Sequence, residues 1–389
     1  MKNQHVTILG GGFAGVEAAI YLRKKGIEVT VVSDRDYLFI YPISIWIPVS
    51  KIAFKDATIL LADLQKVHGF NLIIDRVNSI DSANNIVKLE TQDLTYDYLV
   101  IALGASKVKI EGLENTMSIC GAPNQSLVMK EKFDALLKKG SGKIAIGYGG
   151  NPKDKTGVRG GPAFEILFNF IHVLKQKKIR ENYEITFFAP MKVLGKRMGK
   201  SGFAMLEKLF EKEQIKKRTG KKIKSFLPGK VVFEDDSTLE SDYIMYIPAG
   251  TGHDVLSNSD LQLSDAGFVK IDDNCQVEGL ENVYAIGDIA MIEGPDWVAK
   301  QGHIAEVMAR NTAYNISQQI KGTEKRKGYK DHLNILCVMD TGNGAALTYR
   351  KDEKDFIIPL PKVGHWLKQG WGFYYRNSKL KKFPRIPGM

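Results

Sequence analysis

The sequence lacks any run of about 20 apolar residues, the length that a helix needs to cross a bilayer, so we expect no membrane-spanning helix. It also has few cysteines. Cys120, Cys275 and Cys337 are far apart, without C-x-x-C or Cys/His spacing, which argues against a disulfide framework and against a metal site. Acidic residues are absent from Phe356 to Met389.

Charge and length set broad limits on partners and domains. The net charge is +11, which indicates an anionic partner surface or simply solubility, and no nucleic-acid-binding motif accompanies it. We therefore expect no nucleic-acid partner. A chain of 389 residues with 44% hydrophobic and 25% charged residues is long enough for two or more domains, each with its own core.

Residues 5–34 form the most informative stretch. They give an apolar β-type run, a glycine-rich turn, a helix-like segment and a second β-type run, which predicts a βαβ unit. The glycines are Gly10, Gly12 and Gly15, in the G-x-G-x-x-G spacing that is typical of dinucleotide-binding sites when a strand and a helix flank it.

Each position in this turn has an expected role. Gly10 permits the tight turn, Gly12 lets the backbone approach a pyrophosphate, and Gly15 lets helix and strand pack closely. Free N–H groups at the positive end of the helix, around Phe13 and Ala14, would hold the phosphates. The second run ends at Ser33 and Asp34, where an acceptor for ribose hydroxyls is expected.

A second βαβ pattern starts near residue 142. It comprises a strand-to-glycine turn over 143–150, a helix over 162–178 and a strand over 184–188. Residues 151–162 are inserted between the glycines and the helix, and the strand ends in Ala-Pro, without a carboxylate for a ribose. We therefore expect a retained fold with a degenerate NAD(P)H site.

Other segments complete the expected α/β fold. The region 36–48 is apolar and aromatic, and its two prolines exclude a helix interior. Strands are predicted at 71–74, 87–90, 98–103, 242–247 and 283–286, a hairpin at 231–237, and a helix at 299–320.

Three motifs follow one another along the chain: the glycine-rich opening, the turn at Gly104 and Ala105, and the strand that ends in Gly287 and Asp288. Together they resemble the two-dinucleotide-domain flavoproteins, which are FAD-dependent pyridine nucleotide-disulfide oxidoreductase-like proteins. The resemblance implies FAD as cofactor, with its pyrophosphate on the opening and its ribityl chain at Asp288. Pro42 is assigned to the same site. It also implies two Rossmann-like domains, a discontinuous FAD domain (1–112 and 255–345) and a second domain (113–254), followed by a C-terminal segment (346–389).

Further motifs resemble the sulfide:quinone oxidoreductases. They are Gly161-Pro-Ala-Phe-Glu165, the cysteine in Ser118-Ile-Cys120, the strand Ile335–Asp340 with Cys337, and Lys300 shortly before Gly302. One departure stands out. Relatives carry a third functional cysteine just before the G-P-x-x-E element, where this chain has Arg159. That cysteine normally pairs with the one matched by Cys337, so the usual disulfide-to-persulfide cycle cannot run here as it does in the relatives.

The resemblance assigns chemical roles to the cysteines, each with an alternative. Cys337 would supply the thiolate or persulfide that attacks the flavin, or it is a buried core thiol. Cys120 would assist sulfur transfer or bond to the flavin, or it is inert. Cys275 matches no redox position, and core packing is preferred.

Three other side chains are candidates for charge and proton roles. Glu165, expected in the first turn of a helix, would transfer protons at the sulfur site, or it is placed favourably at a helix N-terminus. Lys300 would put positive charge near the flavin N1–C2=O region, or it is a solvated surface lysine. His303 is a proton donor or, as we prefer, an ordinary helix side chain.

The C-terminal tail interleaves aromatic and basic side chains, which is typical of a segment that lies on a membrane surface without spanning it. The aromatics are Trp366, Trp371, Phe373, Tyr374 and Tyr375, and the cations are Lys368, Arg376, Lys379, Lys381 and Lys382. The alternative is an arm that packs on its own domain or on a twin subunit, which leaves a homo-oligomer open. We expect a peripheral, monotopic protein of the cell membrane, whose tail can be removed without loss of FAD.

The leading functional hypothesis is an FAD-dependent sulfide:quinone oxidoreductase that oxidises sulfide, or a related small sulfur compound, and reduces quinone. Three alternatives remain: a single-subunit NADH:quinone oxidoreductase, a flavin-bearing sensing paralogue that lost turnover with its third cysteine, and a subunit that hands electrons to a cytochrome.

Overall fold

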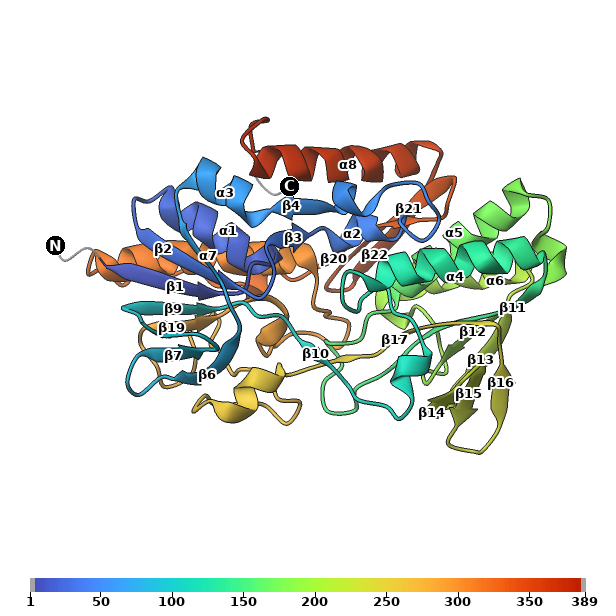
Figure 1. Cartoon of the computed structure of the whole chain (residues 1–389), viewed down its shortest axis with the longest axis horizontal. Coiled ribbons are helices and arrows are strands. Elements are labelled where there is room, and N and C mark those ends of the chain that lie inside the picture. The colour runs from blue at the N-terminus through green and yellow to red at the C-terminus, as the bar shows by residue number, and fades with distance from the viewer. Residues whose placement is uncertain (1–3, 386–389) are drawn as a thin grey trace.

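The computed structural model describes residues 4–385, and its two largest sheets are both parallel (Figure 1). The first has the strand order β19-β9-β1-β2-β5. Its strands are β1 (His5–Leu9), β2 (Glu28–Ser33), β5 (Asn71–Ile74), β9 (Tyr98–Ile101) and β19 (Val283–Ala285). Because β19 comes from far along the chain and pairs with β9, this sheet is built from two separate stretches of sequence.

Helices cover one side of the first sheet. They are α1 (Phe13–Arg23), α3 (Leu61–His68) and α7 (Gly302–Ile320). α1 and α7 pack directly on each other, since both present small buried side chains, Ala18 and Ala19 on α1 and Ala305 and Ala309 on α7. β7 (Ile86–Leu89) pairs with β6 (Val77–Asp81) on one side and with β8 (Asp93–Thr95) on the other. In Figure 1, β6 and β7 lie on the side of the first sheet away from α1.

The second parallel sheet has the order β13-β12-β11-β17. Its strands are β11 (Gly142–Tyr148), β12 (Tyr183–Ala189), β13 (Lys216–Thr219) and β17 (Tyr243–Ile247), and its helices are α4 (Gln125–Lys139), α5 (Gly161–Gln176) and α6 (Gly199–Lys212). β17 is buried along its whole length, as parallel strands covered on both faces require.

A small antiparallel sheet covers the second sheet from the side opposite its helices (Figure 1). It consists of β14 (Ile223–Leu227), β15 (Lys230–Phe233) and β16 (Thr238–Glu240). Phe188, Phe226, Phe233 and Tyr246 form a separate aromatic core between the two layers. The larger core is continuous through the rest of the molecule.

Two chain crossings join the parallel sheets. The chain leaves the first sheet through β10 (Ser106–Lys107) and comes back from the second through β18 (Gly250–Thr251). These two short strands pair antiparallel to each other midway between the sheets (Figure 1). The pairing fixes the two halves of the molecule side by side, with a cleft between them.

The C-terminal part begins with a third sheet and ends with a helix. β20 (Ile335–Asp340), β21 (Gly344–Lys351) and β22 (Lys354–Pro361) are antiparallel neighbours, and α8 (Val363–Lys379) packs across them and onto α2 (Tyr41–Ser44) (Figure 1). The boundary that we drew at residue 346 is therefore wrong as a structural division, since it falls inside β21.

Both βαβ predictions are confirmed, as β1-α1-β2 and β11-α5-β12, and so is the hairpin, which is formed by β15 and β16. In the segment 36–48, β3 (Tyr37–Phe39) pairs with β4 (Thr58–Leu60), and Pro42 lies in the first turn of α2, where its missing N–H costs nothing. Residues 117–119, just before Cys120, do not form a strand. They make one isolated bridge, between Met117 and Met245.

Candidate active site

A cleft of about 2720 Å³ lies between the two parallel sheets and reaches the third sheet and α8. Ordinary ligand pockets measure roughly 300–1,000 Å³, so this one has room for a dinucleotide and a second ligand. Almost every residue that the sequence pointed to lines it. These residues are Gly10, Gly12, Phe13, Ala14, Ser33, Asp34, Pro42, Gly104, Ala105, Cys120, Glu165, Gly287, Asp288, Lys300 and Cys337.

The glycine turn has the steric properties that a pyrophosphate site requires. Gly10 has a φ of +114°, and a Cβ there would overlap with the carbonyl oxygen of Ala102. A Cβ at Gly15, which lies behind the lining, would overlap with the carbonyl oxygen of Gly10. At Gly12, by contrast, a Cβ would meet no atom within 4 Å. The turn is therefore closed on the protein side and open towards the cleft at the start of α1, which fits the phosphates of FAD.

The ends of the strands next to this turn carry polar groups. At the end of β2, the buried Ser33 hydroxyl donates a 2.7 Å hydrogen bond to the carbonyl oxygen of Arg35, and the exposed Asp34 pairs with Arg35 at 3.3 Å. Beyond β19, Gly287 has a φ of +74°, and a Cβ there would lie 3.2 Å from the Cβ of Ala14. Asp288 is thereby held close to the start of α1.

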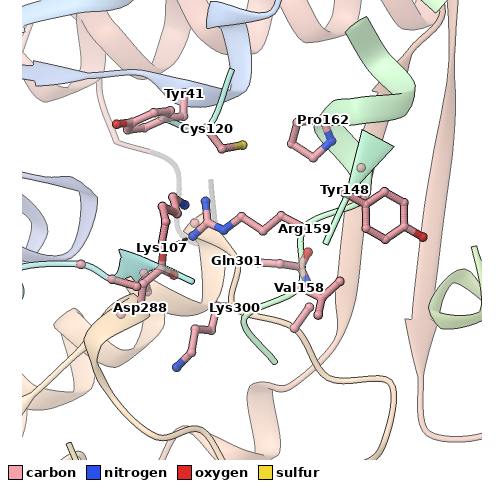
Figure 2. A pocket seen from close by; sticks show the side chains of 18 of the residues that line it. Tyr41, Lys107, Cys120, Tyr148, Val158, Arg159, Pro162, Asp288, Lys300 and Gln301 are labelled. Atoms are coloured by element: carbon pink, nitrogen blue, oxygen red, sulfur yellow. Dashed lines mark hydrogen bonds and ion pairs between the residues drawn. The ribbon is translucent and has the colours of Figure 1, made fainter. Parts of the chain in front are cut away.

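Asp288 has a partner that the sequence did not suggest. The Arg159 guanidinium, from the loop before α5, forms an ion pair with the Asp288 carboxylate (Figure 2). Lys107 points into the same part of the cleft, and burial together with the charge of Arg159 lowers the pKa of its amine to about 8. Two cations and one carboxylate thus meet where the first and second halves face each other.

Cys120 and Lys300 lie at this end of the cleft as well. Cys120 is buried and lies near Tyr41, whose hydroxyl donates to the carbonyl oxygen of Gly121 at 3.1 Å. Lys300 is only 4% exposed, so the surface-lysine alternative is wrong. Its amine donates to the carbonyl oxygen of Ala290 and lies 3.9 Å from the centre of the Phe268 ring.

Burial lowers the pKa of Lys300 to about 7. Its amine points away from Arg159 in Figure 2, and a charge contribution to the flavin stays a prediction. Nearby, His303 lies in the first turn of α7, and its ring Nε2 is 2.9 Å from the Asn334 side-chain oxygen. Cys275 is fully buried in the core, as expected.

Cys337 is the third residue of β20 and is partly exposed, with its strand on the cleft wall. Next to it lies a buried ion pair between Glu165 of α5 and Lys368 of α8. Glu165 also accepts a 2.8 Å hydrogen bond from the backbone N–H of Asp340, at the end of β20. Glu165 is the fifth residue of α5, so our prediction that it lies in the first turn is wrong. The alternative that this carboxylate is simply placed favourably at a helix N-terminus is therefore wrong as well.

The charges around Cys337 determine its protonation. Burial, and then the charge of Glu165, raise the pKa of the Cys337 thiol to about 11, against the opposing effect of Lys368. Burial also raises the pKa of Glu165 itself, although Lys368 counteracts it. At neutral pH the thiol is therefore protonated, and a reaction of its sulfur as a nucleophile needs a proton acceptor.

A buried polar cluster continues from this pair, and sequence reasoning missed it. Asp340 accepts hydrogen bonds from the Asn169 side chain at 2.8 Å and from the Gly342 N–H at 2.9 Å, and it lies 2.5 Å from His365 Nδ1. Burial alone would raise the pKa of Asp340, but these partners hold it below its ordinary value. Lys51 closes the cluster by donating to the Gly342 carbonyl oxygen at 2.6 Å.

Helix α8 places its residues differently from our expectation. Trp366 and Phe373 are 67% and 64% exposed and share the outward face, because they are seven residues, or two helical turns, apart. Leu367 is 53% exposed and lines the cleft. Lys368 and Lys379, which we expected to face lipid, are instead buried in ion pairs. Lys381 and Lys382, just beyond the helix, are exposed. Among the helices within residues 4–385, none combines the length and the apolar character needed to cross a bilayer.

The inner face of α8 and the residues after it contact the half of the molecule that contains the glycine turn. The Lys379 amine pairs with Glu17 of α1 and, at 2.7 Å, with Glu306 of α7, while Arg385 pairs with Glu17 at 2.5 Å. Tyr375 stacks on Phe13 with ring centres 5.0 Å apart. These contacts join the tail to the start of the glycine-turn helix, and they speak against our expectation that the tail can be removed without loss of FAD.

Comparisons with known proteins agree with this geometry. The family model described as pyridine nucleotide-disulphide oxidoreductase matches residues 4–313. The chain is 28% identical over 403 residues to the sulfide-quinone reductase of Aquifex aeolicus (strain VF5), covering 98% of this chain and 90% of that protein. It is 23% identical over 354 residues to the type II NADH:quinone oxidoreductase of Mycobacterium tuberculosis, covering 82% and 74%. The X-ray structure of the Aquifex aeolicus sulfide:quinone oxidoreductase has the same fold, with a TM-score of 0.88 at 24% identity over 97% of this chain and 92% of that one.

Proposed function

The chain belongs to the pyridine nucleotide-disulphide oxidoreductase family and binds FAD, and we propose that it is a sulfide:quinone oxidoreductase. In this proposal it oxidises sulfide, or a related sulfur compound, and reduces membrane quinone. The chemistry that bound FAD supplies is the uptake of two electrons from a donor and their release to an acceptor. The protein contributes the binding of donor and acceptor and the handling of protons.

One observation carries the proposal: a thiol, Cys337, lines the same cleft as the glycine turn. A cysteine sulfur is the side chain that can bond to a substrate sulfur atom. Because the pKa of this thiol is raised to about 11, its proton must be taken up as the sulfur reacts. We assign this task to Glu165, whose raised pKa suits a carboxylate that accepts and returns protons, and we assign to Lys368 the task of holding Glu165 in place.

The remaining lining residues suit the cofactor. Gly10, Gly12, Phe13 and Ala14 would surround the phosphates, with Gly15 behind them. Ser33 and Asp34 would meet the ribose, and Asp288 would meet the ribityl chain. Pro42, Gly104, Ala105 and Gly287 would line the flavin side, with Cys120 and Lys300 close by.

Access to quinone supports an orientation on the membrane. Leu367 and Trp371 of α8 line the cleft, while Trp366 and Phe373 present an apolar surface outside it. Quinones stay in the bilayer, so an α8 that lies in the headgroup layer would open the cleft to its acceptor. In this proposal the protein is monotopic and peripheral.

A second candidate is a single-subunit NADH:quinone oxidoreductase. The cleft extends over Gly150, just beyond β11, and over Lys192 after β12, which leaves room for a second dinucleotide. Similarity to the mycobacterial NADH:quinone oxidoreductase points the same way. Against it, β12 ends at Ala189 and is followed by Pro190, without a carboxylate to bind a ribose.

Anaerobic spectroscopy of the purified flavoprotein distinguishes the candidates. We expect sulfide to bleach the flavin, a short-chain quinone to restore it, and NADH to have no effect. Bleaching by NADH alone would select the second candidate. A flavin that neither donor bleaches would indicate a sensing paralogue, and bleaching by sulfide without a response to quinone would indicate a different acceptor, such as a cytochrome.

A further inference from the structure

The C-terminal sheet leaves large apolar side chains exposed beside α8. Leu336 of β20 and Phe356 and Ile358 of β22 are 49%, 43% and 44% exposed. We propose that the face of β20, β21 and β22 that carries them is a second membrane-contact surface, which binds anionic lipid together with α8. The inference rests on the proposed function, because it extends the orientation in which α8 opens the cleft to quinone.

The strand register places these side chains on one face. In an antiparallel sheet, directly paired residues point to the same side, and so does every second residue along a strand. Two rows of paired residues form the apolar sheet face: Leu336, Tyr349 and Phe356 in one row, and Val338, Leu347 and Ile358 in the next. The rings of Tyr349 and Phe356 stack with their centres 5.0 Å apart, so the outer row is continuous.

Helix α8 lies on the same side of this sheet. A Cβ at Gly364, the second residue of α8, would come within 2.7 Å of the Cβ atoms of Ala345 and Leu360. Ala345 and Leu360 form the next row after Leu347 and Ile358 and therefore point the same way. Because the outward face of α8 points away from the sheet, that face and the apolar sheet face are turned towards the same side of the molecule.

The opposite face of the sheet is covered by the second half of the molecule. Asp355 accepts a 3.2 Å hydrogen bond from the backbone N–H of Ser201 in α6. Arg350 donates a 3.0 Å hydrogen bond to the carbonyl oxygen of Arg197, just before α6. Cys337 points to this covered side as well, because its neighbours on β20 belong to the apolar sheet face. The apolar sheet face is therefore the side that an external partner can reach.

The charges at the rim of the apolar sheet face select the partner. Lys351 and Lys354 pair with each other at the open end of β21 and β22, and both point to the side of this face. Lys362, just before α8, is exposed at the other end. Asp352 and Glu353 belong to the turn, and the chain beyond β22 has no acidic residue. An apolar centre with cations at its rim fits a bilayer that carries anionic headgroups.

The same orientation brings the bilayer to the mouth of the cleft. Leu336 and Val338 of the apolar sheet face line the cleft, as do Leu367 and Trp371 of α8. A membrane seated on the sheet and on α8 would therefore border the cleft from both sides of its opening.

Sedimentation of the full-length holoprotein with phosphatidylcholine vesicles, made with and without phosphatidylglycerol, tests the surface. We expect Phe356→Ser combined with Ile358→Ser to lower partitioning onto both kinds of vesicle by about tenfold or more, with FAD content unchanged. Leu127→Ser combined with Leu227→Ser changes two similarly exposed side chains outside the apolar sheet face. This control should bind as the unmodified protein does.

A second pair of substitutions separates charge from apolar contact. Lys351→Gln combined with Lys354→Gln should lower partitioning by about tenfold or more on vesicles with phosphatidylglycerol, and should have little effect on phosphatidylcholine alone. Lys88→Gln combined with Lys325→Gln removes two exposed lysines elsewhere and is the charge-matched control. This pair decides the matter if the serine variant does not fold.

Several outcomes would overturn the surface. They are no sedimentation of the unmodified protein with either kind of vesicle, unchanged partitioning of the serine variant, and equal losses in the two lysine pairs. A changed oligomeric state of the serine variant with intact vesicle binding would assign the apolar sheet face to a second copy of this chain.

The proposed function and this surface can fail separately. Vesicle binding that depends on Phe356 and Ile358, in a protein whose flavin sulfide cannot bleach, would refute the proposed function and leave the surface standing. Sulfide bleaching, with vesicle binding independent of these two residues, would do the reverse.

Discussion

The backbone N–H of Asp340 donates a 2.8 Å hydrogen bond to the Glu165 carboxylate, although 175 residues separate them. This bond joins the end of β20 to α5, and Lys368 of α8 completes the arrangement. Cys337 lies three residues before Asp340 on β20, so residues of β20, α5 and α8 together form its surroundings. Its reactivity depends on charges that come from distant parts of the chain.

Substitutions at the two charged partners should move the Cys337 pKa in opposite directions. Glu165 raises the pKa of the thiol and Lys368 lowers it. Glu165→Gln should therefore increase the thiolate fraction at pH 8 and speed alkylation by iodoacetamide by up to about tenfold, while Lys368→Met should slow it. Measurement in a Cys120→Ser background isolates Cys337. Equal effects of both variants would show that packing, not charge, governs this thiol.

The glycine turn predicts a sharp difference between two single methyl additions. Gly12→Ala should fold normally but bind FAD weakly, because its methyl group points into open cleft where the phosphates pass. Gly15→Ala should destabilise the protein by about 1–3 kcal/mol or more, because its Cβ overlaps with the Gly10 carbonyl oxygen. FAD titration and thermal unfolding separate the two effects. Tight FAD binding by Gly12→Ala would contradict the assignment.

The outward face of α8 should determine attachment to lipid. Burial of a large apolar side chain contributes about 1.5–3 kcal/mol, so Trp366→Ser combined with Phe373→Ser should lower partitioning onto vesicles by about a hundredfold or more. FAD content should not change, because both side chains point outward. Leu127→Ser combined with Leu227→Ser removes two exposed apolar side chains elsewhere and serves as the control. Undiminished sedimentation of the α8 variant with vesicles would refute the orientation.

The inner face of α8, by contrast, should stabilise the half of the molecule that contains the glycine turn. Lys379→Met removes the amine that pairs with Glu306 and with one carboxylate oxygen of Glu17. Removal of one partner of a buried ion pair typically lowers the free energy of unfolding by about 3–5 kcal/mol. We expect a lower unfolding temperature and weaker FAD retention, whereas Lys382→Met at an exposed position should alter neither. Normal stability of Lys379→Met would show that the tail is a passive arm. For the same reason, membrane binding is better tested with point variants than by deletion of the tail.

Local sequence signals predicted the parts of the fold that short-range physics determines. Gly10, Gly12 and Gly15 lie in one turn whose steric limits follow from their spacing, and the strand runs next to them are apolar because both faces are covered. Asp288 was assigned to the site through the family resemblance, and its position on the cleft fits the rule that parallel strands deliver their carboxyl ends to one edge.

Long-range pairing was not predictable from those signals. Nothing local marks Lys379 as the partner of Glu17, since 362 residues separate them, and interleaved lysines in an aromatic tail look the same whether they face lipid or an internal carboxylate. Asp340, His365 and Lys51 meet only because three elements converge. Arg159 was visible as a departure from the resemblance, but its contact with Asp288 was not.

The most direct test of the account is anaerobic flavin reduction by sulfide in the unmodified protein, in Cys337→Ser and in the core variant Cys275→Ala. We predict that sulfide bleaches the flavin of the unmodified protein and of Cys275→Ala, and that the rate in Cys337→Ser falls by about a hundredfold or more. Bleaching of Cys337→Ser at the unmodified rate would remove this thiol from the reaction and contradict the account.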